Sequence, residues 1–421
     1  MPRQYFGTDG VRGVVGQDLT ADLVERLGRA ATAWSGRGRI FVGRDTRASG
    51  VELEAALARG IASAGGNAVV AGVLPTPAVA LLTLDLGCVI TASHNPPEYN
   101  GVKFFDRDGQ KLTDDQEEQI EALLDHPATG GGEIDEVGVA TDSYLEHVLE
   151  RFGSDLSGLR IGVDCANGAY SGLAPKAFEQ LGADVTTIGN DPDGTNINVE
   201  CGATDLRALQ RLVVGEHLDL GVAFDGDGDR MLAVDANGDV VDGDQIIAIL
   251  ALHLRVDSVT VTPMTNGGFH KLMSDQGVET HVTGEVGDRY VLEAMRTTGS
   301  KLGGEQSGHI IYLDGHVTGD GLVAALLLCG ALEGRTLAAA AAAMPVYPQA
   351  KENIRVKQKR LTNELLEAVA QKNAELQGRG RVLVRPSGTE PVVRVLAEAD
   401  DEAEAANLCA TIASLVRREL G

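Results

Sequence analysis

The feature that most constrains this fold is the repeated alternation of a short β-branched run with an amphipathic helical stretch. Such pairs occur at residues 39–45 with 51–65, 159–168 with 171–182, 218–224 with 244–255, and 258–264 with 268–277. A strand followed by a helix that returns the chain to a parallel neighbour is the building unit of α/β folds. The pattern therefore predicts an α/β protein whose parallel sheets are flanked by helices.

The chain is too long for one hydrophobic core. Its 421 residues, 43% of them hydrophobic, suggest about three domains of roughly 150 residues each. Residues 126–139 are rich in glycine and acidic residues and lack periodicity, which indicates a surface connection and a boundary near residue 143. An Ala-rich helix over 336–344 ends at Pro345. We expect residues 346–421 to form a small α+β domain that alternates strand, helix, strand, helix.

Composition argues against several classes of function. The chain carries 61 acidic and 36 basic residues, a formal charge of −25, so broad electrostatic binding to nucleic acid or anionic lipid is not expected. An anionic substrate would need its own local cluster of Arg, Lys and backbone amides. No apolar run is long enough to cross a membrane and the N-terminus lacks an apolar signal core, which predicts a cytoplasmic protein.

The cysteines give no sign of a metal site or a disulfide framework. They are far apart in the sequence and lack metal-binding spacing. We expect all five to be reduced and buried: Cys88, Cys165, Cys201, Cys329 and Cys409.

The strongest chemical signal is DGDGDR, Asp225 to Arg230, which lies between two apparent strands. Asp225, Asp227 and Asp229 are separated only by glycine, so the chain can turn tightly and converge three carboxylates on one small, hard cation. Magnesium is the natural choice. An EF-hand calcium site would need a longer loop, a distant bidentate glutamate and flanking helices. The alternative without a function is an acidic hairpin turn.

The segment TASHNP, Thr91 to Pro96, follows the apolar run at residues 88–90. The carboxyl end of a strand is where α/β folds tend to place their sites, so we expect Ser93 to be presented rather than buried. With His94 and a divalent cation nearby, its hydroxyl could carry a phosphoryl group, because the metal would offset a charge of about −1.5 to −2. Taken alone, the segment is equally consistent with an ordinary Asn-Pro loop.

Two basic residues are candidates for handling that phosphate. Lys103 lies between apolar residues in NGVKFF, where partial desolvation could lower its pKa enough for acid or base chemistry. Arg12 lies in the glycine-flanked loop FGTDGVRG and could reach a phosphate. For Lys103, the alternative is a surface lysine whose charged end reaches solvent. For Arg12, the alternative is a structural salt bridge in a turn.

The segment GEQSGH carries groups that suit a sugar. It places the carboxylate of Glu305, the hydroxyl of Ser307 and the imidazole of His309 in one short loop. These groups suit sugar hydroxyls or an amino group. The alternative is a polar loop at the start of a helix, with the serine as its cap.

The segment RPSGTEP begins at Arg385 and follows the apolar residues 382–384. Its guanidinium, two hydroxyls and glycine amide make a phosphate cradle by composition, with a plain hairpin turn as the alternative. Arg394, on the following strand, either supports the cradle or forms a structural ion pair.

Taken in order, TASHNP, DGDGDR, GEQSGH and RPSGTEP resemble the serine, metal, sugar and phosphate loops of the α-D-phosphohexomutase superfamily, over essentially the whole chain. The resemblance implies four domains around a central cleft. Three would be related α/β/α sandwiches at residues 1–143, 144–242 and 243–345, and the fourth an α+β domain of the TATA-box-protein-like type at 346–421. The stretches YFGTDGVRG, NGVKFF, CGATDLRAL and VGDRYVLEAM resemble the branch that acts on hexosamine phosphates.

The resemblance also implies a role for each motif residue. Ser93 would be the phosphoserine, and the magnesium ion would be bound by it together with Asp225, Asp227 and Asp229. The transfer site would be completed by Arg230, Lys103, His94 and Arg12. The sugar would be contacted by Glu305 and Ser307, with His309 close by. The phosphate that does not react would be held by Arg385, Ser387, Gly388 and Thr389.

The activity that this implies is the interconversion of glucosamine 6-phosphate and glucosamine 1-phosphate through a 1,6-bisphosphate, which supplies UDP-N-acetylglucosamine and cell-wall synthesis. A glucose or mannose phosphate substrate stays open, because such relatives share the serine and metal loops. A noncatalytic protein that binds a sugar phosphate or a divalent ion is the alternative from a different class. Relatives are often dimers, so a homodimer is expected by resemblance. A phosphate contact near Glu285, where a basic residue can occur, also stays open.

Overall fold

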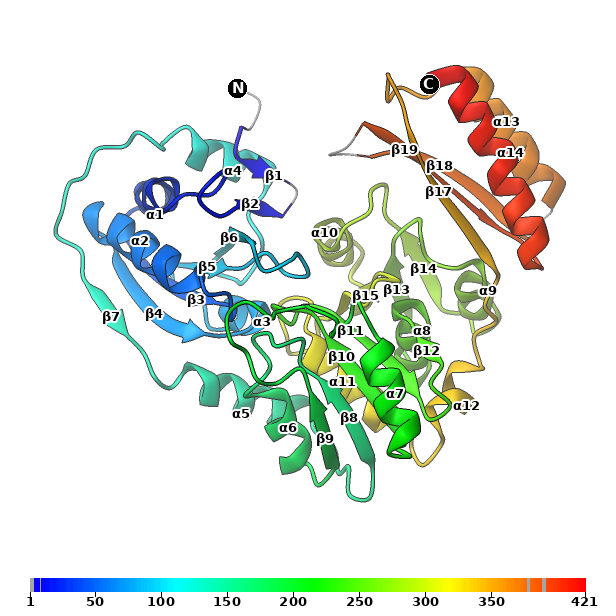
Figure 1. Ribbon diagram of the computed structural model, residues 1–421, viewed down its shortest axis with the longest axis horizontal. Helices are drawn as coiled ribbons and strands as arrows, with labels where there is room; N and C mark the ends of the chain where they lie inside the picture. Colours follow the sequence, from blue (N-terminus) through cyan, green and yellow to red (C-terminus); the bar gives the residue numbers. More distant parts are fainter. Residues whose placement is uncertain (1–3, 8, 377–378, 388–390) are drawn as a thin grey trace. The chain divides into compact units, whose positions relative to one another are not determined.

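The computed structural model describes residues 4–7, 9–376, 379–387 and 391–421, and the chain divides into two compact units (Figure 1). The first unit comprises residues 1–263 and 279–342, and the second comprises residues 264–278 and 343–421. Three mixed sheets with flanking helices lie in the first unit, and one antiparallel sheet lies in the second. The predicted α/β class with an α+β C-terminal part is confirmed. The domain boundaries expected at residues 143, 242 and 345 stay a prediction.

The first sheet has the spatial order β1-β2-β6-β5-β3-β4-β7. Its strands are β1 (Phe6–Gly7), β2 (Gly10–Val14), β3 (Arg39–Arg44), β4 (Asn67–Val73), β5 (Leu86–Ile90), β6 (Tyr99–Asp106) and β7 (Ile134–Glu136). The strands β3, β4, β5 and β7 pair in parallel, whereas β6 is antiparallel to β5 and to β2. The associated helices are α1 (Ala21–Ser35), α2 (Gly50–Ser63), α3 (Thr76–Leu81) and α4 (Asp114–Glu121).

The local sequence explains where these helices begin and what they cover. Thr20 caps α1 by accepting a hydrogen bond from the amide of Leu23, and α4 begins with a capping box between Thr113 and Gln116. The helices α1 and α2 lie side by side (Figure 1). Their apolar faces form one buried core with the strands, in which Leu27 and Leu57 are fully enclosed.

The second and third sheets repeat a parallel core with an antiparallel edge. The second contains β8 (Arg160–Asp164), β9 (Asp184–Ile188), β10 (Leu220–Phe224), β11 (Met231–Asp235) and β12 (Val240–Val241), with helices α5 (Ala140–Phe152), α6 (Ala174–Gln180) and α7 (Arg207–Gly215). The third contains β13 (Ser258–Val261), β14 (Glu279–Val282), β15 (Leu302–Gly304) and β16 (Ile310–Tyr312). Its part of the chain also forms α8 (Gly243–Leu254), α10 (Asp288–Thr298), α11 (Gly321–Ala331) and α12 (Leu337–Ala341).

Three motif loops occupy equivalent places in these three sheets. TASHNP follows β5 and leads to the antiparallel β6, DGDGDR joins β10 to the antiparallel β11, and GEQSGH joins β15 to the antiparallel β16. Each loop thus starts at the carboxyl end of a strand with parallel neighbours. This is the edge of the sheet at which α/β folds gather functional groups.

The second unit differs from the expected alternation. Its antiparallel sheet has the order β17-β19-β18, formed by β17 (Gln349–Arg355), β18 (Arg381–Pro386) and β19 (Val392–Glu398). Its helices are α9 (Gly267–Asp275), α13 (Asn363–Leu376) and α14 (Glu402–Leu420). The part after residue 346 therefore runs strand, helix, strand, strand, helix, because RPSGTEP connects two antiparallel strands.

The connection at residues 126–139 contains the edge strand β7, which pairs in parallel with β4. All three residues of β7 are exposed, so the strand is held by backbone hydrogen bonds without the apolar alternation that would reveal it.

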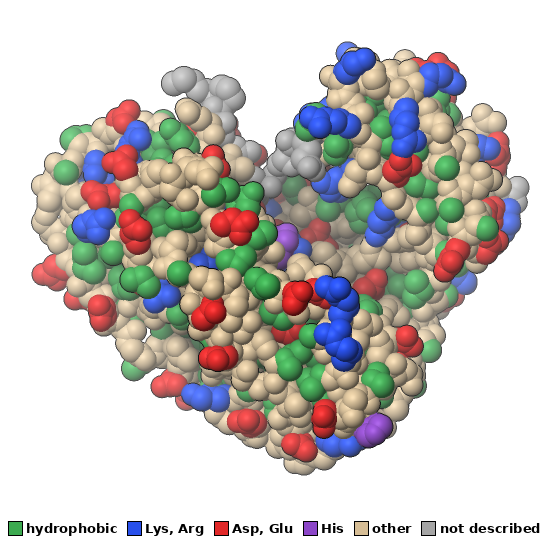
Figure 2. All heavy atoms as spheres, in the orientation of Figure 1, with side chains coloured by type: hydrophobic (Ala, Val, Ile, Leu, Met, Phe, Trp, Pro, Cys, Tyr) green, Lys and Arg blue, Asp and Glu red, His purple; other side chains and the backbone are tan. Residues whose placement is uncertain are grey.

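The surface carries charged side chains of both signs. On the face shown in Figure 2, acidic and basic side chains are interspersed over each unit. Within the described residues, the helices are either too short or too polar to cross a bilayer. All five cysteines are free and buried, as the sequence predicts.

Candidate active site

Three aspartates converge at the carboxyl end of β10. One carboxylate oxygen from each of Asp225, Asp227 and Asp229 lies within 4.8 Å of the other two, and all three residues are buried. The Oδ1 atoms of Asp227 and Asp229 have no hydrogen-bond partner among the described residues. Buried carboxylates with unpartnered oxygens are costly unless a cation neutralises them. The residues present therefore fit a small divalent cation with oxygen ligands.

The pKa values of these aspartates are shifted by burial and by the charges of their neighbours. Burial, together with the charges of Asp229 and Asp227, raises the pKa of Asp225 well above its ordinary value. Burial also acts to raise the pKa of Asp227, but the ammonium of Lys103, 3.0 Å away, the hydroxyl of Thr76 and the charge of Arg12 together reverse this and leave the pKa lowered. Asp225 would thus tend to hold a proton that a bound cation would displace.

The serine of TASHNP reaches this cluster directly. Ser93 Oγ donates a hydrogen bond to Asp225 Oδ2 at 2.6 Å, and Nδ1 of His94 lies 3.1 Å from Ser93 Oγ. Burial, aided by the charges of Arg230 and Arg12, lowers the pKa of His94 to about 4, so this imidazole is neutral at pH 7. The expectation that Ser93 is presented was wrong, since only 2% of it is exposed. The loop packs against the metal loop: the Cβ that Gly226 lacks would lie 2.7 Å from the carbonyl oxygen of Ser93.

The two cations expected near the serine are present, but both differ from their predictions. Lys103 lies on β6 with its Nζ 3.0 Å from Asp227 Oδ2. Burial acts to lower its pKa, but Asp227, Asp9 and Asp229 raise it above the ordinary value, so the expected lowering is wrong. Arg12 lies on strand β2 rather than in a loop, and it is paired with Asp9.

The sugar-loop residues lie beside the same cluster. Glu305, Ser307 and His309 are in the turn between β15 and β16, so the loop is part of a β-hairpin and not the start of a helix. His309 Nδ1 is 3.8 Å from an oxygen of Asp229, and its Nε2 is 3.4 Å from an oxygen of Asp288. Ser307 is exposed, whereas Glu305 is buried and its pKa is raised chiefly by that burial. A hydroxyl, a carboxylate and an imidazole are thus available close to the aspartates.

The phosphate-loop segment lies in the second unit. Arg385 on β18 is directly opposite Arg394 on β19. Like charges in opposed positions on a sheet repel, and an anion bound between them would relieve that repulsion. Ser387 is buried and donates its amide to the carbonyl of Val392, while Gly388 and Thr389 lie outside the described residues.

Sequence reasoning missed several residues that border the triad. Asp9 accepts a hydrogen bond from Lys111 at 2.9 Å and lies 3.4 Å from Lys103, and Lys111 also pairs with Asp288. Thr76 donates its hydroxyl to Asp227 Oδ2 at 2.8 Å. Asp9 could have been suspected, since it precedes Arg12 by three residues in the same motif. Lys111 and Thr76 carry no local signal, because their partners are more than 100 residues away.

Asp320 is a buried carboxylate that packs near the loop of the three aspartates. Asp320 accepts hydrogen bonds from the hydroxyls of Tyr144 and Tyr170, both at 2.7 Å, and caps α11. The ring of Tyr170 lies where a Cβ on Gly228 would be, and Gly228 has a φ of +78°, which favours glycine. The amide of Gly321 donates to the carbonyl of Gly228. Asp320 therefore connects the start of α11 to the turn that carries the aspartates.

We expect Asp320→Ala to destabilise the protein. It would remove the shared acceptor of two buried hydroxyls, which lie 2.6 Å apart and can then satisfy only one of the two donors, and it would remove a helix cap, a loss of about 3 kcal/mol. Urea or thermal unfolding would measure the change. The matched control is Asp314→Ala, which removes a solvent-exposed ion pair with Lys301 and should leave the free energy of unfolding nearly unchanged. Equal stability of the two variants would contradict this reading.

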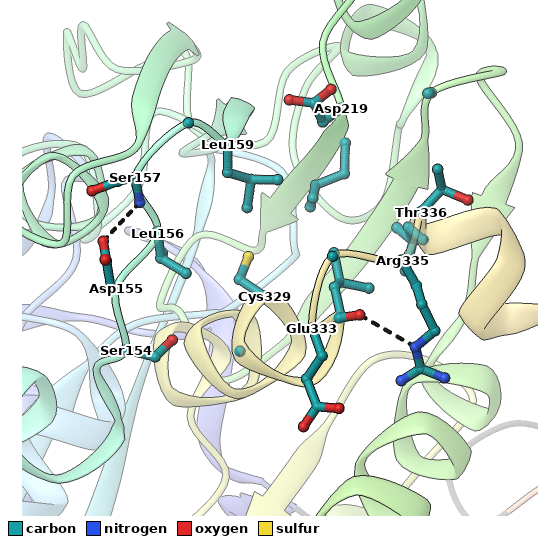
Figure 3. A pocket seen from close by; sticks show the side chains of 17 residues that line it. Ser154, Asp155, Leu156, Ser157, Leu159, Asp219, Cys329, Glu333, Arg335 and Thr336 are labelled. Atoms are coloured by element: carbon teal, nitrogen blue, oxygen red, sulfur yellow. Dashed lines mark hydrogen bonds between the residues drawn. The ribbon is translucent and has the colours of Figure 1, made fainter.

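A separate pocket of about 480 Å³ lies away from these motifs (Figure 3). One side is formed by residues 154–159 and another by the end of α11 with residues 332–337. Two of its polar groups bond within their own loops: Asp155 accepts from the amide of Ser157, and Arg335 donates to the carbonyl of Leu332. None of the motif residues lines it, so it is not the site that the sequence indicates.

Comparison with known proteins identifies the class. Four profiles of the phosphoglucomutase/phosphomannomutase family match: α/β/α domain I at residues 3–129, domain II at 142–238, domain III at 242–349 and the C-terminal domain at 352–415. The chain belongs to this family and is a phosphohexomutase-type isomerase.

The particular relatives carry a narrower name. A phosphoglucosamine mutase of Moorella thermoacetica is 49% identical over 97% of this chain and 98% of its own length, and one of Clostridium acetobutylicum is 46% identical over 99% of each. A phosphoglucomutase/phosphomannomutase family protein of Burkholderia thailandensis has a similar structure, with a TM-score of 0.85, 25% identity, and coverage of 99% and 98%. The N-acetylphosphoglucosamine mutase of Aspergillus fumigatus, solved with GlcNAc-6P and magnesium, has a TM-score of 0.70 at 19% identity, with coverage of 99% and 96%. This last likeness concerns the fold alone.

Proposed function

We propose that this protein interconverts glucosamine 6-phosphate and glucosamine 1-phosphate through a phosphorylated Ser93 and a 1,6-bisphosphate. The observation that carries the proposal is the 2.6 Å hydrogen bond between Ser93 Oγ and the triad residue Asp225. It joins an oxygen that can be esterified to carboxylates that fit a cation. The full-length identity to proteins named phosphoglucosamine mutase supports the choice of substrate.

The proposed reaction is two opposite phosphoryl transfers. First, the bond between phosphorus and Ser93 Oγ breaks as the free hydroxyl oxygen of glucosamine 6-phosphate bonds to phosphorus. That hydroxyl loses its proton and Ser93 Oγ gains one, which gives the bisphosphate and a free serine. After the bisphosphate turns end for end, its other phosphoryl group returns to Ser93 Oγ and leaves glucosamine 1-phosphate.

The charged groups around Ser93 suit these steps. The protonated ammonium of Lys103, with a raised pKa, can stabilise negative charge on the transferred group and supply a proton. Arg230 and Arg12 would bind the phosphoryl oxygens, and His94 would remain a neutral hydrogen-bonding partner of the serine.

Magnesium is the cation that we propose for Asp225, Asp227 and Asp229, together with the phosphorylated Ser93. When bound, it would neutralise charge on the transferred phosphoryl group. Glu305, Ser307 and His309 would orient the sugar, and Arg385, Ser387, Gly388 and Thr389 would hold the other phosphate. The homodimer and the cytoplasmic location stay predictions.

A comparison of three substrates tests the specificity. We expect kcat/KM for glucosamine 6-phosphate to exceed that for glucose 6-phosphate and mannose 6-phosphate by at least about 10-fold, the discrimination that one polar contact to the amino group supplies. All three rates are measured at saturating magnesium with the phosphorylated protein. A preference for either neutral sugar would overturn the substrate assignment while leaving the phosphoserine mechanism in place.

A further inference from the structure

One arginine lies beneath the serine loop with its entire guanidinium engaged. Arg47 follows β3 and is fully buried. Its Nη2 donates to the carbonyls of Ser93 and Asn95 at 2.9 and 2.8 Å, and its Nη1 donates to those of Pro96 and Tyr99. Four backbone carbonyls between residues 93 and 99 therefore accept hydrogen bonds from one planar guanidinium.

The fifth donor of this guanidinium fixes its orientation. Nε of Arg47 donates to Asp45 Oδ2 at 2.9 Å, and both side chains are completely enclosed. The same Asp45 oxygen accepts the hydroxyl of Thr91 at 2.7 Å, and the Thr91 oxygen in turn accepts the amide of Ser93 at 2.8 Å. The amide and the carbonyl of Ser93 are thus both connected to the Arg47–Asp45 pair.

The backbone of Ser93 needs such support. Its φ is +50°, in the left-handed region that residues with a Cβ seldom adopt. Such a conformation persists only where its surroundings determine it strongly. Asn198 adds a second donor to the Ser93 carbonyl, at 2.8 Å. In this conformation Ser93 Oγ donates its hydrogen bond to Asp225 Oδ2.

We propose that Arg47 is a positioning residue for phosphoryl transfer. Its guanidinium is oriented by Asp45 and connected through Thr91 to the amide of Ser93. It thereby holds Ser93 in the strained conformation that brings Oγ to the three aspartates. The proposal rests on the proposed role of Ser93. The charges of Arg47 and Asp45 cancel within their buried ion pair. Arg47 therefore acts by fixing the backbone of the serine loop, not by placing a net charge near the reaction. Lysine cannot replace it, because an ammonium presents three donors from one atom whereas these contacts need five donors in a planar fork.

The test compares Arg47→Lys with Arg44→Lys. Arg44 lies three residues away, is half-buried and pairs with Glu54, and it makes no contact with the serine loop among the described interactions. Each protein is phosphorylated with glucose 1,6-bisphosphate and mixed, in excess, with glucosamine 6-phosphate, and the formation of glucosamine 1-phosphate is followed by rapid quenching. We expect the single-turnover rate of Arg47→Lys to fall by about 100-fold, the cost of a small misplacement of the reacting atom. Its KM should stay within about 3-fold, and Arg44→Lys should transfer at the normal rate.

Thr91 provides a second pair of variants in case Arg47→Lys does not fold. Thr91→Val keeps the volume but removes the hydroxyl that joins Asp45 to the Ser93 amide, and it should slow transfer by at least about 10-fold. Thr91→Ser keeps the hydroxyl and should restore the rate. A folded Arg47→Lys with the normal single-turnover rate, or equal rates for the two Thr91 variants, would overturn the positioning role. An active Ser93→Ala variant would instead overturn the phosphoserine mechanism itself, so the two failures are distinguishable.

Discussion

Ser93→Ala should lower kcat by at least about 10⁴-fold, because it removes the protein atom that forms and breaks a covalent bond to phosphorus in the proposed reaction. The Ser93 side chain makes one hydrogen bond to a carboxylate and one contact with His94, so its loss should change the free energy of unfolding little. Sugar phosphate binding should persist, since the proposed sugar and phosphate contacts come from other loops. Steady-state rates and binding by calorimetry measure the two effects.

The control for this variant is Ser414→Ala. Ser414 is an exposed residue of α14 whose hydroxyl donates only to the carbonyl of Ala410. Its replacement should leave both activity and stability close to normal. Incubation of each protein with a hexose 1,6-bisphosphate, followed by intact mass, should add one phosphate to the control and none at residue 93 in the Ser93 variant. Normal turnover by Ser93→Ala would eliminate the covalent mechanism.

Asp227→Asn should raise the magnesium concentration needed for half-maximal activity by more than about 100-fold, since even outer-shell changes at metal sites cost 10- to 100-fold. The substitution removes one of three converging charges. It also places an amide where Oδ2 accepts from both Lys103 and Thr76. The amide oxygen can keep both contacts, while the NH2 group takes the place of the unpartnered Oδ1, where it cannot bind a cation.

Two measurements separate metal binding from catalysis in this variant. Activity is titrated with magnesium, and binding of manganese to the substrate-free protein is followed by calorimetry. Asp239→Asn is the matched control, because Asp239 is an exposed acid on the turn between β11 and β12. It should leave both titrations unchanged. A normal magnesium titration for Asp227→Asn would contradict the assignment of the triad.

Much of this site could be read from local sequence. DGDGDR alternates acid with glycine directly after an apolar run, and a short loop of this kind has few ways to arrange its carboxylates other than together. The order of the four motifs then identified the superfamily. By contrast, β7 gave no apolar signal, because all three of its residues are exposed.

The errors at single residues share a physical cause. The protonation of Lys103 depends on Asp227 and Asp9, which lie 124 and 94 positions away along the chain at 3.0 and 3.4 Å from its ammonium. Burial alone predicts a lowered pKa, and the surrounding carboxylates reverse the sign. Ser93 follows a strand as expected, yet it is enclosed by groups from other parts of the chain.

The sequence by itself determined the kinds of groups available and the order in which they follow strands, because side-chain chemistry and hydrophobic periodicity are local properties. Only the tertiary structure decided that Arg47 lies under the serine loop, that Thr76 and Lys103 share one oxygen of Asp227, and that Ser93 adopts a positive φ. These depend on distances between segments that are remote in the chain. Coulomb and hydrogen-bond energies vary with such distances, and no local pattern encodes them.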